Sequence, residues 1–298
     1  MKQNSLAKIN VILSMLIFST IGLFTKSIGM PSSLLASARG FIGVIFLGLF
    51  MLATRKKIAK NEIKQNALWL LLSGAAIGFN WIFLFESYKY TGIPTATLCY
   101  YLAPAIVVFV SPLILREKAN GVKLLAATLA LLGMVPISGI LSGGVGNLRG
   151  IAFGIAAAVL YASVMLMNKK MKDISGYGRT VSQLLLAAVC VLPYALLTED
   201  VSALRFDSND LYLTLIVGVV HTGIAYALYF SAMNSLPAQT TAVLSYIDPA
   251  AAVLISAAAA AVAPSFFGAE SLTLTTAFGA VLILGSSLFA EVWDHRKK

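Results

Sequence analysis

The chain has 298 residues, of which 59% are hydrophobic and 11% charged, and its mean hydropathy is +0.87. A water-soluble domain carries about 25% charged residues, so this composition indicates a protein whose solvent is lipid. The formal net charge of +10 would fit a nucleic-acid-binding protein, but the basic residues gather in short clusters between apolar runs. That distribution is typical of membrane proteins.

Each apolar run is close to the ~20 residues that a helix rising ~1.5 Å per residue needs to cross a membrane. We therefore predict an all-α integral membrane protein with ten transmembrane helices. The predicted spans are 9–28, 32–53, 66–90, 94–115, 121–139, 150–168, 177–197, 210–234, 237–262 and 271–292. The first run follows two lysines, as a secretory signal would, but no small-x-small cleavage site follows it, and we interpret it as a retained helix.

The lysine and arginine residues lie mostly in alternate loops. If the N-terminus is inside, the cytoplasmic segments hold 17 of them, and the outer loops hold four, namely Lys26, Lys89, Arg149 and Arg205. This asymmetry follows the positive-inside rule. It predicts a multi-pass protein of a bacterial-type plasma (inner) membrane with both termini in the cytoplasm.

The two halves of the sequence can be aligned at a nearly constant offset. Gly74 falls on Gly218 at an offset of 144, and the stretch "YLAP" at 101–104 falls on "YIDP" at 246–249 at an offset of 145. Five helices is an odd number, so the second copy would enter the membrane from the opposite side, as in inverted-repeat transporters. We predict a first repeat in residues 1–140, a connecting loop in 141–149 and a second repeat in 150–298.

Pro104 and Pro249 occupy matching positions in the middle of their predicted spans. A proline removes one backbone hydrogen bond and kinks a helix. Kinked helices at corresponding places in both halves point to the repeat interface as the binding region. The alternative is that the two prolines only shape helix packing.

These features resemble a known family. Ten helices in two inverted repeats, a mid-span proline in the fourth helix of each, and an acidic residue opening the fifth (Glu117 in "REKANG", Glu270 in "GAESLT") resemble the EamA-type transporters of the drug/metabolite transporter superfamily. The resemblance covers nearly the whole chain. It implies alternating access through a central cavity, and a substrate among amino acids, metabolites, quaternary amines or drugs, commonly moved outward. Both glutamates are also expected to complement the positive ends of the helices that they open.

Polar residues near the membrane centre are costly and usually mark a pathway. Asp248 and His221 each lie eleven residues into a predicted span, which is about 16 Å deep, and Asn80 and Trp81 lie at a comparable level. Because Ala103 replaces the acid in the first copy, the fold does not require it. Asp248 is therefore expected to hold a cationic group of the substrate or to carry a coupling proton, with His221 as its partner. The alternatives are a protonated core acid and a neutral core histidine.

A second group of polar residues lies roughly 7–11 Å from the outer surface. Arg39 and Glu86 form either a structural ion pair or outer gate, or contact the substrate directly. Glu86 also belongs to an aromatic face that is expected to line a cavity, and Asp248 continues a polar stripe. The face comprises Phe79, Phe83, Glu86 and Tyr90, and the stripe comprises Thr241, Ser245 and Asp248.

A guanidinium can hold a carboxylate while an acid takes an ammonium group. The sequence therefore predicts a secondary transporter of a small polar or zwitterionic metabolite, with amino-acid export preferred. A drug or quaternary-amine transporter is the alternative, because aromatic rings bind cations, and a channel is a further one. The predicted substrate-binding residues are Arg39, Asn80, Trp81, Phe83, Glu86, Tyr100, Tyr101, His221, Tyr246 and Asp248.

Catalytic motifs are missing from the sequence. It contains no His-x-x-x-His, no cysteine pair at ligand spacing, no Gly-x-Ser-x-Gly and no nucleotide-binding loop. We therefore predict that the protein is not an enzyme and needs no metal or cofactor. The expected partners are a small-molecule substrate, the lipid bilayer and protons, and not nucleic acid.

Overall fold

The computed structural model describes residues 2–25, 27–91, 93–137, 147–200, 207–262 and 274–296, and all the secondary structure within these ranges is helical. In this part of the chain, seven helices are long and apolar enough to cross a membrane by length and composition, and two shorter apolar helices accompany them. The chain is thus a multi-pass, all-helical membrane protein.

The helices of the first half fall on the predicted spans, although the spans 9–28 and 94–115 are each divided into two helices, with breaks at residues 20 and 101. The bounds of α3 coincide with the predicted 32–53, whereas α4 begins six residues before the predicted start at 66. The elements are α1 (Lys2–Ser19), α2 (Ile21–Thr25), α3 (Ser32–Ala53), α4 (Lys60–Thr91), α5 (Ile93–Tyr100), α6 (Leu102–Leu115) and α7 (Gly121–Ile137).

Two of the predicted spans in the second half are divided into shorter pieces. The span 210–234 contains a π-helix, η3, between two α-helices, and the span 237–262 is interrupted at residue 246. The elements are α8 (Leu148–Lys170), α9 (Gly176–Thr198), α10 (Ser208–Ile216), η3 (Val217–Ile224), α11 (Ala225–Ala232), α12 (Ala238–Ser245), α13 (Ile247–Val262) and α15 (Leu274–Arg296).

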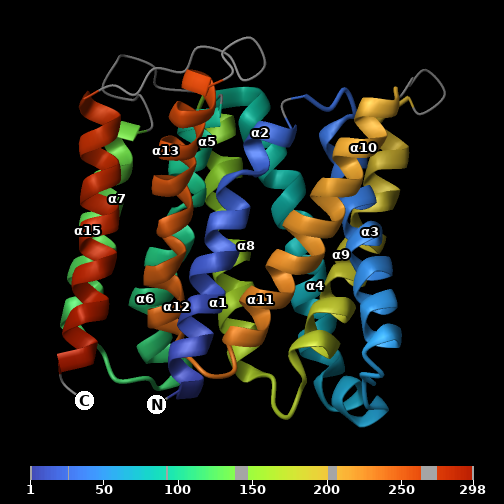
Figure 1. The fold of residues 1–298 in the computed structure, drawn as a ribbon, viewed down its shortest axis with the longest axis horizontal. Helices are drawn as coiled ribbons and strands as arrows, with labels where there is room; N and C mark the ends of the chain where they lie inside the picture. The colour runs from blue at the N-terminus through green and yellow to red at the C-terminus, as the bar shows by residue number, and fades with distance from the viewer. Residues whose placement is uncertain are drawn as a thin grey trace.

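The helices run roughly parallel to one another, and the start of α1 and the end of α15 lie at the same end of the bundle (Figure 1). Helices of the first half pack mainly on helices of the second. The principal contacts are α4 on α8 and α9, α3 on α9 and η3, α1 on α11 and α13, α6 on α8 and α12, and α7 on α15.

Glycines allow some of these helices to approach very closely. A Cβ atom added to Gly74 of α4 would lie 2.5 Å from Cβ of Leu186 in α9. One added to Gly218 of η3 would lie 2.5 Å from Cβ of Ile42 in α3. Small residues at such contacts are what holds helices together in lipid, where no hydrophobic driving force acts between them.

At the end of the bundle that carries the termini, cations cap the carbonyl ends of neighbouring helices. The Arg179 guanidinium, fully buried, donates to the backbone oxygen of Phe230 (3.1 Å) and to the side chain of Asn234. Lys169 donates to the backbone oxygens of Met233 and Leu236. The last turn of α11 therefore receives two positive charges from α8 and α9, which complement the negative end of its dipole.

Glu117 does not complement the helix that follows it, contrary to the expectation from sequence. Its carboxylate accepts the N–H group of Ala238 (2.9 Å) at the start of α12. The start of α7 is capped instead by Asn120, whose side-chain oxygen accepts from Val122 (3.1 Å) and Lys123 (3.3 Å). Glu117 therefore complements the positive end of α12, a helix in the other half of the chain. Glu270 lies outside the described residues.

Candidate functional site

Two helices break at matching positions in the two halves. The first break, at Tyr101, separates α5 from α6 with φ −75° and ψ 7°. The second, at Tyr246, separates α12 from α13 with φ −69° and ψ −9°. Each lies three residues before a proline, because the proline ring excludes the carbonyl of the residue four positions earlier and the helix is interrupted just after that carbonyl.

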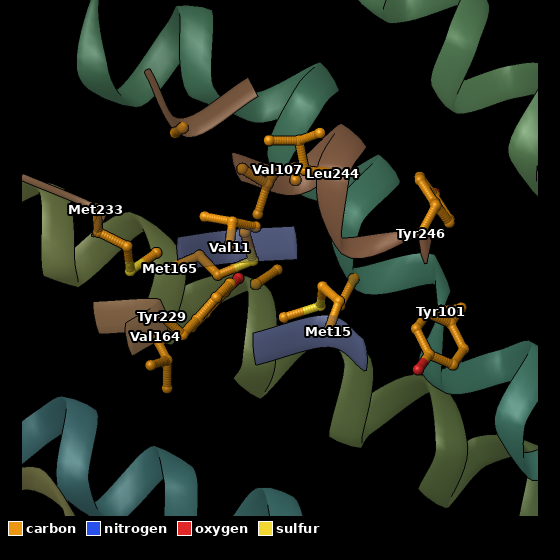
Figure 2. Packing of buried hydrophobic residues seen from close by; sticks show 14 of the residues in the cluster. Val11, Met15, Tyr101, Val107, Val164, Met165, Tyr229, Met233, Leu244 and Tyr246 are labelled. Carbon is orange, nitrogen blue, oxygen red and sulfur yellow. The ribbon is translucent and has the colours of Figure 1, made fainter. Parts of the chain in front are cut away.

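The two breaks lie against each other in the interior. The helices α6 and α12 are in contact, and the Tyr101 hydroxyl lies within hydrogen-bonding reach of the Asp248 carboxyl. Tyr246 is fully buried, and its hydroxyl lies near the backbone of Ala105 without a hydrogen bond of ordinary geometry. Figure 2 shows Tyr101 on a segment of the first half and Tyr246 on a segment of the second, both within the buried cluster.

A chain of hydroxyl groups begins beside Asp248. The Tyr161 hydroxyl of α8 donates to that of Tyr229 in α11 (3.2 Å), and Tyr229 is 3.2 Å from the Ser245 hydroxyl. Ser245 in turn donates to the backbone oxygen of Thr241 (2.9 Å). Tyr229 also lies within electrostatic range of Asp248. The predicted polar stripe on α12 is therefore extended by tyrosines from two other helices.

Stacked rings surround the first break. Tyr100 is stacked on Tyr161, with ring centroids 5.3 Å apart and planes 8° apart, and meets Tyr101 edge-on at 5.7 Å. The Tyr100 hydroxyl reaches the side-chain oxygen of Asn80 (3.5 Å), whose amide nitrogen donates to the backbone oxygen of Ala157 (2.6 Å). Asn80 thereby connects α4 of the first half to α8 of the second.

Arg39 occupies the face of Trp81. Its guanidinium carbon lies 4.5 Å from the centre of the Trp81 ring, and both side chains are buried. The indole nitrogen of Trp81 donates to the Tyr226 hydroxyl (3.3 Å). Ring contacts continue from Tyr226 to Phe230 (5.2 Å) and from Phe230 to Tyr229 (5.7 Å). A continuous series of contacts thus leads from Arg39 to the hydroxyl chain beside Asp248, and we call it the aromatic track (Arg39, Trp81, Tyr226, Phe230 and Tyr229).

His221 and Asp248 have different immediate neighbours, although they lie at similar depth. His221 is buried in η3, and its Nε2 is 2.9 Å from the Thr20 hydroxyl, at the point where α1 gives way to α2. Its ring lies 5.0 Å from that of Phe24. Arg39 is within electrostatic range of His221. The His221 imidazole therefore contacts Thr20, between α1 and α2, whereas the Asp248 carboxyl contacts Tyr101.

The remaining predicted residues lie along α4 toward its C-terminal end. Glu86 accepts a hydrogen bond from the Tyr194 hydroxyl (3.3 Å). Phe83 packs on Phe153 of α8, with ring centroids 5.7 Å apart, and Tyr90 is stacked on the same ring at 6.0 Å. Within the described ranges, no group of three or more His, Cys, Asp or Glu residues could hold a metal ion.

Sequence reasoning missed Tyr161, Tyr226 and Tyr229, which complete the site. The internal repeat could have pointed to one of them, Tyr226. Tyr226 lies 145 residues after Trp81, whereas Gly74 and Gly218 of the same predicted spans are 144 residues apart, so the repeat places Trp81 within one residue of Tyr226. The structure joins these two side chains directly.

Comparisons with known proteins agree with this architecture. The model of the EamA-like transporter family matches residues 5–139 and 148–291. An uncharacterized transporter of Bacillus subtilis strain 168, YxxF, is 30% identical over 85% of this chain and 82% of its own. An uncharacterized transporter of Archaeoglobus fulgidus is 26% identical over 94% of each chain.

A solved crystal structure shares the fold. It superposes with a TM-score of 0.83 over 99% of each chain at 22% sequence identity. The family match extends over nearly the whole chain, and the names of the relatives point to transport rather than catalysis. The chain belongs to the EamA-like transporter family.

Proposed function

We propose that the protein is a secondary transporter that exports a small zwitterionic metabolite, with amino acids as the substrate class. The observation that carries this proposal is the aromatic track, which leads from a buried guanidinium at Arg39 to Tyr229, within electrostatic range of the Asp248 carboxyl. Because four rings lie between the two charges, Arg39 would hold the substrate carboxylate and Asp248 the ammonium group at successive stages of transport. Both groups are buried or half-buried among helices of the two halves.

The proposed architecture is ten transmembrane helices in two inverted repeats, residues 1–140 and 150–298. The helix packing supports it, because most of the principal contacts have a counterpart when the halves are exchanged. The helix α4 packs on α8 as α11 packs on α1, α4 on α9 as η3 on α3, and α6 on α8 as α13 on α1. The contacts α3–α9 and α7–α15 join equivalent helices, and α6–α12 joins the two spans that break at Tyr101 and Tyr246.

Individual residue contacts are also exchanged between the two halves. Gly74 meets Leu186, and Gly218 meets Ile42 at the same 2.5 Å, and both glycine and partner are exchanged by an offset of 144. Such pairing of equivalent surfaces supports two mirror-related conformations, one open to each side of the membrane. Alternating access is the mechanism that we propose.

The broken helices are the proposed moving elements. A break frees backbone groups from helical hydrogen bonds, and such discontinuities form binding sites in transporters. Tyr101 reaches from the first break to Asp248 in the second. Binding of an ammonium group at Asp248 would therefore act on both broken helices together. Asp248 is also the proposed carrier of a coupling proton, and His221, which contacts Thr20, is a separate proposed proton-coupling residue.

A quaternary-amine or drug substrate is the second candidate, and the ring cluster around Asp248 favours it. Tyr100, Tyr101, Tyr161 and Tyr229 supply aromatic surfaces close to one carboxyl group, which is the chemistry that binds a cation without requiring Arg39. The two candidates differ in whether the substrate needs a carboxylate.

Transport assays on the purified protein in proteoliposomes test the proposal. A thermal-shift screen of metabolites would first identify ligands, since a molecule that binds only the folded state raises its stability. Saturable uptake and counterflow of a zwitterion are expected, with a weaker response to its decarboxylated amine. Non-saturating flux without counterflow would indicate a channel and contradict the proposal.

The proposed location is a bacterial-type plasma membrane with both termini in the cytoplasm. The position of both termini at one end of the bundle supports it. Single cysteines at Lys57 and Lys172 should be labelled only from the cytoplasmic side, and cysteines at Lys26 and Arg205 only from outside. Labelling of all four from the same side would contradict the proposed topology.

A further inference from the structure

The end of α3 combines a lipid-facing surface with a cluster of cations. Ile45, Leu49 and Leu52 on this helix are 61%, 61% and 77% exposed, and in a membrane-spanning chain such apolar side chains contact acyl tails. The helix ends at Ala53, and the following segment, residues 54–64, lies at the end of the bundle that carries the termini.

Five exposed cations lie within this segment of eleven residues. They are Arg55, Lys56, Lys57, Lys60 and Lys64. The single acid in the segment, Glu62, is turned to the protein: its Oε2 accepts the N–H group (3.1 Å) and the hydroxyl (2.8 Å) of Ser175. The Glu62 carboxylate, which would otherwise neutralise these cations, is therefore hydrogen-bonded to Ser175 at the start of α9.

The backbone at the end of α3 holds two of these cations in fixed positions. The N–H of Arg55 bonds to the Leu52 oxygen (3.2 Å), and that of Lys56 bonds to the Met51 oxygen (2.9 Å). This is a Schellman motif, whose left-handed position normally holds glycine. Here Arg55 occupies it with φ 53°, a backbone conformation that L-residues other than glycine rarely adopt.

An aromatic pair fixes the ammonium group of Lys56 at the same level. Lys56 donates to the Tyr177 hydroxyl (3.1 Å) and lies 4.2 Å from the centre of the Tyr177 ring. The Tyr177 and Phe50 rings are stacked with centroids 5.7 Å apart. Tyrosine is favoured at the level of lipid headgroups because one end of its side chain is apolar and the other polar.

Other cations at this end of the bundle are used differently. Arg179, Lys169 and Lys170 donate to backbone oxygens at the ends of α11 and α6, and Lys123 donates to the Thr240 hydroxyl (2.7 Å). Those residues stabilise helix ends, whereas the cations of residues 54–64 are presented at the boundary of an exposed apolar helix face.

We propose that residues 54–64, with Phe50 and Tyr177, bind the headgroup of an anionic phospholipid such as phosphatidylglycerol. The cations hold the phosphate, and the acyl chains lie along the exposed face of α3. A soluble anion would find the same charges but would leave the apolar face unused. Clusters of basic residues beside a membrane helix recognise anionic lipids in this way.

The test compares two variants that remove the same charge from the same end of the protein. The first is Lys57→Gln, Lys60→Gln and Lys64→Gln together. The matched control is Arg116→Gln, Lys118→Gln and Lys172→Gln, whose side chains are also exposed. Dioleoyl phosphatidylglycerol and dioleoyl phosphatidylcholine are titrated into the purified protein, and bound lipid is counted by native mass spectrometry alongside the melting temperature.

The wild type should retain phosphatidylglycerol in preference to phosphatidylcholine. The first variant should bind it roughly 100-fold more weakly, because each interfacial cation contributes on the order of fivefold in affinity, and the control should change by less than about threefold. Equal losses in both variants would show unspecific charge attraction and overturn the proposal. Equal retention of the two lipids, or full competition by inorganic phosphate, would overturn it as well.

Discussion

The two broken helices have the same backbone form but differ in one residue beside the proline. At Tyr101 and Tyr246 the backbone angles agree within 16°, and a proline follows three residues later in each. The first copy has Ala103, which is fully buried, and the second has Asp248, which is half-buried and reached by Tyr101. The break is thus formed with or without an acid, so the break belongs to the architecture, and the acid is the part that we propose to serve transport.

Exchanging the two residues should have very unequal effects. Ala103→Asp places a carboxyl at a fully buried position, and an acid near the centre of a membrane helix costs about 3 kcal/mol. We expect loss of most of the folded, monodisperse protein in detergent. Asp248→Ala, which makes the second break resemble the first, should fold with a melting temperature within a few degrees of the wild type. Equal loss in both variants would mean that Asp248 is structural.

The glycines that are equivalent in the two halves should respond alike. Gly74→Ala and Gly218→Ala each place a Cβ atom 2.5 Å from another Cβ, and such overpacking costs about 1–3 kcal/mol. Both should lower the melting temperature by similar amounts. Gly48→Ala is the control, because nothing lies within 4 Å of its added Cβ, and it should be neutral or stabilising. A large loss at only one of the first two would weaken the equivalence of the halves.

Arg39 supplies the charge that distinguishes the two proposed substrate classes. Arg39→Ala should reduce kcat/KM for a zwitterion about tenfold or more, because a hydrogen bond to a charged group contributes about 1.5–3 kcal/mol. Transport of a quaternary amine should fall less than about threefold. Arg149→Ala is the control, since Arg149 also lies over a ring, that of Tyr90 at 5.6 Å, but is exposed. Equal losses for both substrates would make Arg39 a structural residue.

Removing the hydroxyl group from Tyr101 or from Tyr246 should change stability and substrate binding less than the substitutions above. Tyr101→Phe removes the hydroxyl that reaches Asp248, which should cost about 1 kcal/mol in stability or substrate binding. Tyr246→Phe removes a buried hydroxyl without a hydrogen bond of ordinary geometry and should be neutral or slightly stabilising. Ligand binding by isothermal calorimetry and melting temperatures of both variants provide the comparison. The reverse order would contradict the assignment of Tyr101 as the partner of Asp248.

The positions of the long apolar helices could be predicted from the sequence, because length and apolarity decide which segments cross lipid. The span 32–53 agrees with α3 at both ends. The partners of the helix ends could not be deduced in this way. Glu117 was assigned to its own helix because sequence reasoning sees only neighbours in the chain, whereas the N–H group that it accepts belongs to Ala238, 121 residues away.

Only part of the candidate site could be predicted from the sequence. Counting residues along a helix gives the depth of a side chain but not the direction in which it points. For this reason Asp248 and His221 were paired by depth, although Asp248 contacts Tyr101 and His221 contacts Thr20. The repeat carried more information than depth did, because applying its offset to Trp81 leads to within one residue of Tyr226.

The most direct test of the account is transport by Asp248→Asn with and without a pH gradient. The substitution keeps the size of the side chain and removes its charge. We predict normal folding, loss of any acceleration of uptake by a pH gradient, and at least partial retention of substrate exchange in its absence. Loss of exchange together with ligand binding would instead make Asp248 a substrate ligand. Wild-type behaviour in both assays would contradict the claim that Asp248 serves transport.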